Sequence, residues 1–232
     1  MQFRVISIGA SASHALWNER EAVRTGHATT TLIQSGDRTI LVDPGLPAPV
    51  LGARLNERSG KRLADVTDVF LTSFHPDTRR ALAELQHGRW LMSSEERESV
   101  GGAIGAQIRH ILESGAHREE GGASLLELLK NDIALLQRCE VAPDTIAERV
   151  DLFPLPGVTP GLSGLLLEGE RFTTVICGDA VPTVEHLEQG KVPSVASDLD
   201  RARESFQDAL EVADLLVLGR DNMVVNPTKR PF

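Results

Sequence analysis

The spacing of apolar and polar residues changes twice along the chain. Short β-branched runs dominate up to about residue 99, helical spacing dominates the middle, and β-rich runs return after residue 149. Alternation with a period of two indicates strands, whereas apolar residues three and four apart indicate helices. The pattern therefore predicts two β-rich halves that flank a helix-rich segment at about 100–148, within one domain spanning residues 1–232.

In the first half, Phe3–Ile8 alternates as a strand does. Thr29–Gln34 and Thr39–Val42 form a predicted hairpin, because the Gly-Asp pair in Ser35–Arg38 between them is turn chemistry. Val50–Asn56 has helical spacing, and a Ser-Gly pair ends it.

The next stretch contains the first candidate for chemistry. Val66–Thr72 reads as a buried strand, and Arg79–Leu85 reads as a helix. A loop between a strand end and a helix start is a common place for functional residues. Ser93 then fits an N-cap, with Glu96 completing a capping box three residues later.

The helical middle carries a broad apolar stripe made of Leu125, Leu126, Leu128, Leu129, Ile133, Leu135 and Leu136. Such faces usually pack against a core, and a partner-binding groove is the alternative reading. The remaining predicted elements are strands at Trp90–Met92, Val150–Phe153, Ser163–Glu168, Phe172–Cys177 and Leu215–Leu218, and a helix at Leu199–Ala213.

Composition narrows the class of protein. The chain has 232 residues, 41% hydrophobic and 25% charged, which is typical of a globular domain. The net charge of −9 and the lack of a basic block argue against nucleic acid or an anionic membrane as partner. Two distant cysteines, Cys139 and Cys177, give no disulfide framework, so we expect a cytoplasmic protein. No apolar run approaches the ~20 residues of a membrane span.

His75 and Asp77 alternate in the loop after the buried strand, an arrangement that suits a metal ion. Ser73 and Thr78 beside them are poor metal ligands. Simpler roles exist for each: Asp77 or Thr78 as the N-cap of the next helix, and His75 as an ordinary hydrogen-bonded histidine.

Several landmarks in order along the chain resemble the metallo-β-lactamase superfamily. They are Thr31–Val42 with Asp43-Pro44-Gly45, Thr72–Thr78, Pro156–Gly161, Cys177–Ala180 and Leu218–Asn222. The resemblance covers nearly the whole chain. It implies an α+β fold, an αββα sandwich of metallo-β-lactamase type, and a pair of zinc ions at one edge of the sandwich.

Carried over by position, the resemblance keeps only part of the implied zinc site. Three ligand positions hold His75, Asp77 and Asp179, which remain the candidate metal ligands. The four substituted ligand positions hold Ser73, Thr78, Val158 and Arg220. Asp43 resembles the family's second-shell aspartate, although Asp43 and Asp179 could each simply end a strand in a turn.

A catalytic zinc ion needs about three protein ligands and a water molecule. Arg220 would bring a permanent positive charge to the site. We therefore predict that its guanidinium neutralises Asp77 or Asp179 in place of the lost metal. The remaining histidines show no short ligand spacing and read as surface residues, with His27 and His186 the two that could lie near the mouth of the pocket: His14, His27, His87, His110, His117 and His186. Cys177 reads as a buried packing residue, and the sequence assigns no catalytic residue.

Two functions remain open from the sequence. The first is a non-catalytic or strongly altered family member, a pseudoenzyme that needs no cofactor and keeps an acidic pocket for a small molecule. The second is a hydrolase of esters, lactones or related bonds that uses zinc or another divalent metal held by His75, Asp77 and Asp179. The sequence does not indicate an oligomeric state.

Overall fold

A computed structural model describes residues 1–229, apart from the side chains of His117 and Glu120. Within these residues the strands form two sheets of six. The first sheet runs in the order β1 (Gln2–Ser7), β2 (Thr30–Ser35), β3 (Arg38–Val42), β4 (Asp68–Phe70), β5 (Arg89–Met92) and β6 (Glu140–Val141). The second runs in the order β12 (Met223–Val225), β11 (Leu215–Val217), β10 (Thr173–Ile176), β9 (Ser163–Glu168), β8 (Val150–Pro154) and β7 (Thr145–Ala147).

Both sheets are mixed. The pairs β1–β2 and β2–β3 are antiparallel, and β3 to β6 then pair in parallel. In the second sheet only β10 and β11 pair in parallel. The predicted hairpin is confirmed: Gly36 in its turn has a φ of 58°, a value that glycine adopts without strain.

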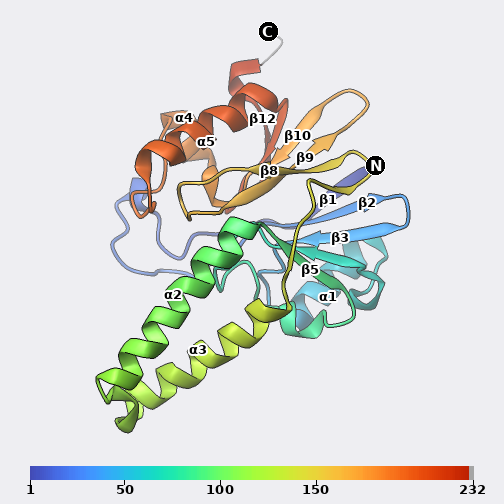
Figure 1. Cartoon of the computed structure of the whole chain (residues 1–232). Coiled ribbons are helices and arrows are strands. Elements are labelled where there is room, and N and C mark those ends of the chain that lie inside the picture. The colour runs from blue at the N-terminus through green and yellow to red at the C-terminus, as the bar shows by residue number, and fades with distance from the viewer. Residues whose placement is uncertain (230–232) are drawn as a thin grey trace.

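Helices cover the outer faces of the two sheets (Figure 1). They are α1 (Ala48–Ser59), α2 (Ser94–Glu113), α3 (Glu120–Arg138), α4 (Val184–Gln189) and α5 (Leu199–Val212). In Figure 1, α1 lies against the first sheet and α5 against the second, while α2 and α3 form a hairpin that projects from the body.

Three apolar layers follow from this stacking. The middle layer joins side chains of both sheets, among them Val42 and Phe70 from the first and Ile176 and Val217 from the second. The outer layers pack Leu51 and Leu55 of α1, and Phe206 and Ala209 of α5, against their sheets. The predicted αββα sandwich is confirmed, because the two sheets pack face to face and helices pack on the apolar outer face of each.

The leucine stripe of α3 divides between the inside and the outside of the helical hairpin. Leu126 and Leu129 pack against Ile104 of α2, whereas Leu125 and Leu128 are exposed. Core packing therefore accounts for the inner half of the stripe. Among residues 1–229 no helix is both long enough and apolar enough to cross a bilayer.

The predicted helix at Arg79–Leu85 is wrong. Turns and a short 3-10 helix, η3 (Leu82–Glu84), occupy this stretch. Backbone groups that an α-helix would use are bonded elsewhere, since the Asp77 carbonyl accepts from Ala28 N and Ala81 N donates to the Pro44 carbonyl. Tertiary hydrogen bonds replace the helical ones here.

The predicted N-cap of α2 is confirmed, but the capping box is only half formed. The Ser93 hydroxyl accepts a hydrogen bond of 3.1 Å from Glu96 N. The buried Glu96 carboxylate does not return to Ser93. It accepts instead from Phe74 N at 3.0 Å and from the Thr159 hydroxyl at 2.6 Å. Glu96 thus ties two loops to the start of α2.

Candidate functional site

The loops that follow β4, β10 and β11 meet at one edge of the sandwich. Thr29 N donates to the Gly219 carbonyl at 2.8 Å, and Gly219 N donates to the Val181 carbonyl at 3.1 Å. These bonds tie the segment before β2 and the loops of the second sheet into one unit. The candidate site residues of both halves of the chain are therefore neighbours.

Two glycines permit this close approach. Gly178 has a φ of 52°, and a Cβ there would lie 2.8 Å from the side chain of Thr72. A Cβ on Gly219 would lie 2.3 Å from the Gly178 carbonyl oxygen. The glycines that precede Asp179 and Arg220 thus let these two side chains face each other.

Arg220 lies between two carboxylates. Its Nε and Nη2 donate to the two oxygens of Asp179, both at 2.8 Å, and its Nη1 donates to Oδ2 of Asp77 at 2.6 Å. The arginine side chain is 9% exposed, against 17% for Asp77 and 20% for Asp179. The contact predicted for Arg220 is therefore present, and it involves both aspartates.

The pairing changes how the groups titrate. Burial alone would raise the pKa of Asp179, but the adjacent Arg220 charge outweighs it, so that the pKa lies below its usual value. Burial likewise opposes the charge on Arg220, and Asp179 reverses that effect and raises the pKa of the guanidinium. Both partners are held in their charged forms.

A second arginine completes the coordination of Asp77. Arg80 donates from Nη2 to Oδ1 of Asp77 at 2.9 Å and to the Gly26 carbonyl at 3.1 Å. Each of the four carboxylate oxygens of Asp77 and Asp179 therefore accepts a hydrogen bond from an arginine.

His75 lies at the rim of this ion cluster. Its side chain is 54% exposed, and Nδ1 accepts from Asp77 N at 3.2 Å while lying 3.8 Å from Oδ2 of Asp77. Partial burial and then the charge of Arg220 lower the pKa of His75, which favours the neutral ring. The third candidate ligand is thus near the two carboxylates but directed partly to solvent.

The remaining substituted positions are used by the fold. The Thr78 hydroxyl donates to the carbonyls of Ser73 and His75 at 2.7 and 2.8 Å, so neither Thr78 nor Asp77 caps an α-helix. Val158 lines a cleft beside Asp179 and Arg220.

The residues at the ligand positions do not fit a metal ion in this arrangement. Oxygen ligands must turn their lone pairs to the metal, and those of Asp77 and Asp179 face guanidinium groups. Within residues 1–229, leaving aside His117 and Glu120, no three histidine, cysteine, aspartate or glutamate side chains are grouped to hold a metal.

Asp43 lies beneath the ion cluster, at the end of β3. Its carboxylate accepts from Thr72 N at 2.9 Å and from the Thr72 hydroxyl at 2.7 Å, and its φ of 48° fits a turn. Burial raises the pKa of Asp43 to about 7, a shift that the two Thr72 hydrogen bonds only partly oppose. Cys177 nearby is fully buried, and burial raises the pKa of its thiol.

Two histidines that the sequence placed on the surface are buried beside this site, which corrects that prediction. His14 is 3% exposed and His186 is 8% exposed. The Thr183 hydroxyl oxygen lies 3.0 Å from Nε2 of His14 and 2.9 Å from Nδ1 of His186. The order Thr183, Glu185, His186 after the Gly-Asp loop was a usable signal for His186, whereas the sequence pattern offered none for His14.

Two cavities open next to Arg220. The larger has a volume of about 280 Å³, with apolar walls from Val158, Pro182 and Val195 and polar walls from Asp179 and His186. The smaller, of about 170 Å³, is lined by His14, Trp17, Glu185 and Asp221. Ser11, His14 and Arg220 line both, so the two cavities adjoin.

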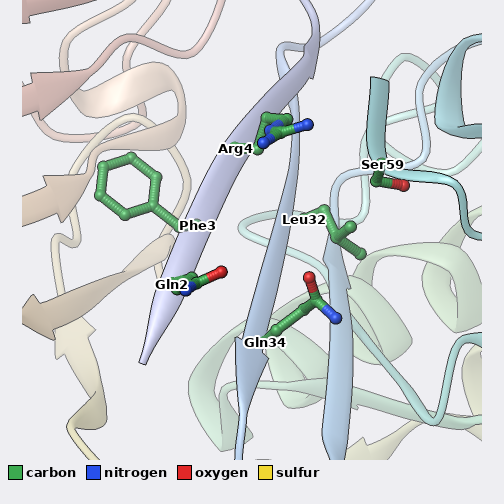
Figure 2. A pocket seen from close by; sticks show the side chains of 6 residues that line it. All are labelled: Gln2, Phe3, Arg4, Leu32, Gln34 and Ser59. Carbon is green, nitrogen blue, oxygen red and sulfur yellow. The ribbon is translucent and has the colours of Figure 1, made fainter. Parts of the chain in front are cut away.

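A hollow of about 70 Å³ lies elsewhere, on β1, β2 and the end of α1 (Figure 2). Figure 2 shows Phe3 on the opposite side of β1 from Ser59. The single charged side chain that lines the hollow belongs to Arg4, and it donates to the Arg58 carbonyl. The hollow lacks converging acids or histidines, so the edge with Arg220 is the candidate site.

Comparisons with known proteins give a family model that matches part of the chain. The model of the metallo-β-lactamase superfamily matches residues 23–98. No curated protein matches the chain in sequence.

Solved structures resemble the whole fold. A Thermotoga maritima protein described as a metallo-β-lactamase matches 97% of this chain and 98% of its own, with a TM-score of 0.68 and 16% identity. AidC, a dizinc quorum-quenching lactonase, matches 88% of this chain and 76% of its own (TM-score 0.65, 18% identity). An N-acyl homoserine lactone hydrolase with N-hexanoyl-L-homoserine at its catalytic metal centre matches 82% of this chain and 80% of its own (TM-score 0.55, 19% identity).

The stacked sheets, the outer helices and the site at the sandwich edge define an αββα protein of metallo-β-lactamase type. Residues 23–98 resemble the metallo-β-lactamase superfamily, and the similarity over the rest of the chain is one of fold.

Proposed function

We propose that this chain is a single metallo-β-lactamase-type domain that binds a small molecule and has lost the dinuclear metal centre. The observation that carries the proposal is the pairing of Arg220 with both Asp179 and Asp77. The guanidinium supplies the positive charge that a metal pair would otherwise supply to these carboxylates.

Electrostatics supports this exchange. Two unit charges 4 Å apart interact by about 4 kcal/mol at an effective dielectric constant near 20, and a divalent ion doubles this value. A metal ion entering beside Arg220 would meet that repulsion and would also have to break the hydrogen bonds of the guanidinium. The two aspartates favour the arginine that is already in place.

The substituted positions support it further. Metal ligands at Ser73, Thr78 and Val158 would have to be imidazoles, whereas a buried serine, a hydroxyl committed to two carbonyls and an isopropyl group occupy them. Sites with fewer than three well-placed protein ligands rarely hold catalytic zinc.

The ligand would lie in the cleft of about 280 Å³ beside Arg220. Apolar walls with a few converging polar groups are typical of small-molecule sites. Two of the similar structures carry homoserine products in their sites, which makes a small organic molecule a reasonable ligand class.

The alternative is a metal-dependent hydrolase that uses His75, Asp77 and Asp179, and it is favoured by the similarity to a dizinc lactonase. Elemental analysis of protein purified without chelator separates the two. We expect substoichiometric zinc, iron and manganese, and the same melting temperature with and without EDTA. Near-stoichiometric metal that is lost in His75→Ala would overturn the proposal.

Arg220→Ala and Arg80→Ala form a matched pair for the same test. Both remove a guanidinium from Asp77, but only the first also releases Asp179. If Arg220 excludes the metal, added zinc should raise the melting temperature of Arg220→Ala more than that of Arg80→Ala. An equal response of both variants would argue against the exclusion by Arg220.

A further inference from the structure

The start of α4 fixes the position of one hydrogen on the ring of His186. Thr183 immediately precedes the helix, and Glu185 and His186 lie in its first turn. The Thr183 hydroxyl donates to Oε2 of Glu185 at 2.7 Å, because an ionised carboxylate can only accept. The hydroxyl oxygen is left to accept from the two histidine rings, whose nitrogens lie 2.9 Å (Nδ1 of His186) and 3.0 Å (Nε2 of His14) away. Nδ1 of His186 therefore carries a hydrogen.

In the neutral ring of His186, Nε2 is then a free acceptor. It has no hydrogen-bond partner among the residues that the structure describes. In that part of the chain, the buried side-chain atoms without a partner are Nδ1 of His14, Oγ1 of Thr31 and Nε of Arg97. Nε2 of His186 is not among them, so this acceptor retains contact with solvent.

His186 lies where two clefts adjoin. One is the cleft of about 280 Å³ beside Arg220, and the other has a volume of about 390 Å³. Ala15, His186 and Ser194 line both. Since the Nδ1 side of the ring is turned to Thr183, Nε2 is the nitrogen of His186 that a molecule in these clefts can reach.

The charges of the smaller cleft are already balanced. Asp179 and Arg220 line it and are bonded to each other, and Arg80 donates to Asp77 on the far side of Arg220. Burial lowers the pKa of His186, which favours its neutral ring. A charged ligand would find no unpaired counter-charge here, whereas an uncharged ligand needs none.

The larger cleft differs in charge. Lys191 and Arg203 line it, and Arg203 pairs with Asp200, while Lys191 donates to the amide oxygen of Gln189. An anion would therefore favour this second cleft. The two ligand classes can be separated by their charge.

Three serines indicate which uncharged donor suits the smaller cleft. Ser11, Ser13 and Ser194 line it together with His186. A hydroxyl group has one hydrogen to donate and lone pairs to accept, so it can donate to an imidazole nitrogen and accept from a serine at the same time. An amide N–H can only donate.

We propose that the cleft of about 280 Å³ binds an uncharged small molecule through a hydroxyl group that donates to Nε2 of His186. The apolar part of the molecule lies against Val158, Pro182 and Val195. The inference deepens the proposed function and rests on it, because the cleft is balanced only while Asp179 is paired with Arg220 rather than with a metal ion.

Phenol and anisole test the hydroxyl hydrogen, since they share a ring and only phenol has that hydrogen. In a two-bond ¹H–¹⁵N spectrum of the histidine rings at pH 7.5, phenol should shift the Nε2 signal of His186 in a saturable manner. Anisole should bind about tenfold more weakly, the loss expected for one hydrogen bond. Equal affinities, or a free protein whose His186 carries its hydrogen on Nε2, would overturn the proposal.

Two variants test the residues. His186→Phe keeps a ring and removes the acceptor, so phenol and anisole should then bind equally well. Thr183→Val leaves His186 in place but removes the partner of its Nδ1, and it should also weaken phenol binding. His87→Phe is the matched control, because His87 is exposed in the turn before β5. Phenol affinity that is the same in all three variants would contradict the contact.

Benzoate and metal analysis keep the explanations apart. Benzoate has the same ring with a negative charge, and it should not displace phenol; displacement at equal concentration would overturn the choice of an uncharged ligand. Metal-free protein that does not bind phenol would contradict the hydroxyl site alone. Near-stoichiometric metal would contradict the proposed function, whatever phenol does.

Discussion

Two aspartates flank strand β4, the buried Asp68 at its start and the partly exposed Asp77 in the loop after it, and they are neutralised in different ways. At the start of the strand, the fully buried Asp68 accepts from Nε of Arg89 at 2.7 Å and Nη1 of Arg38 at 3.3 Å. These arginines are 38–39% exposed. In the loop after the strand, Asp77 shares Arg220, itself 9% exposed, with Asp179.

The two ends differ in which member of the ion pair is buried, the carboxylate at the first end and the arginine at the second. At the first end one carboxylate has two arginines that water also solvates, so either arginine can be lost without stranding a charge. At the second end one buried arginine serves two carboxylates: Asp77 also accepts from Arg80, which is 30% exposed, whereas both oxygens of Asp179 accept from Arg220. Removing one partner of a buried ion pair leaves an uncompensated charge, which costs far more than the pair contributes. The site end is balanced only as a complete set.

The largest expected effect comes from removing the shared cation. Arg220→Ala should lower the free energy of unfolding by about 3 kcal/mol, because both Asp77 and Asp179 lose their main partner. Urea unfolding at pH 7 measures it. Arg220→Lys keeps the charge but loses the bidentate geometry, so its free energy of unfolding should lie between those of the wild type and Arg220→Ala. A loss below ~1 kcal/mol would mean that water already solvates the two carboxylates.

A pH series sharpens the comparison through Asp43, a buried carboxylate without an arginine. Its pKa is raised in the folded state to about 7, so its contribution to stability is complete below the unfolded pKa near 4 and is lost as the pH rises to 7. The unfolding free energy of the wild type relative to Asp43→Asn should therefore fall by about 3 kcal/mol over that window. A flat difference would contradict the raised pKa.

Asp179, held by Arg220, should behave in the opposite sense. Its lowered folded pKa means that its contribution is present above pH ~4 and is lost on acidification below that value. Asp179→Asn should cost about 1 kcal/mol more at pH 7 than Asp77→Asn, because Asp179 accepts two of the three hydrogen bonds from Arg220. Equal losses would indicate that the bidentate geometry does not matter.

The smallest effect is expected at the other end of β4. Arg38→Ala should cost about 0.5 kcal/mol, since Arg89 remains on Asp68 and the lost arginine was well solvated. Chemical unfolding of this variant beside Arg220→Ala tests the contrast directly. Similar losses in the two variants would remove the distinction between the two ends.

Much of the architecture could be predicted from local patterns. The strand at Ser163–Glu168 and the hairpin after Thr30 agree with the prediction, because each is a short apolar or β-branched run bounded by turn residues. The strands β6 and β7, of two and three residues, were missed, since elements so short acquire their structure from neighbours. The stretch after Thr78 does not form the predicted helix for a related reason: its backbone groups make hydrogen bonds to distant segments.

The residues of the candidate site likewise divide into those that the sequence identified and those that it did not. Motif order alone identified His75, Asp77, Asp179 and Arg220, and the charges of these residue types alone predicted that Arg220 would neutralise a carboxylate. The burial of His14 and His186 could not be predicted, because it depends on two loops that are far apart in the chain.

By itself the sequence indicated the class of fold and the residues at each ligand position, through the resemblance of its ordered motifs to the metallo-β-lactamase superfamily. Only the tertiary structure decided how these residues pair. Hydrogen bonds and ion pairs require contact within about 3 Å, and contact between Asp77, Asp179 and Arg220 exists only where loops of both sheets meet. The same packing buried the imidazoles of His14 and His186 beside them.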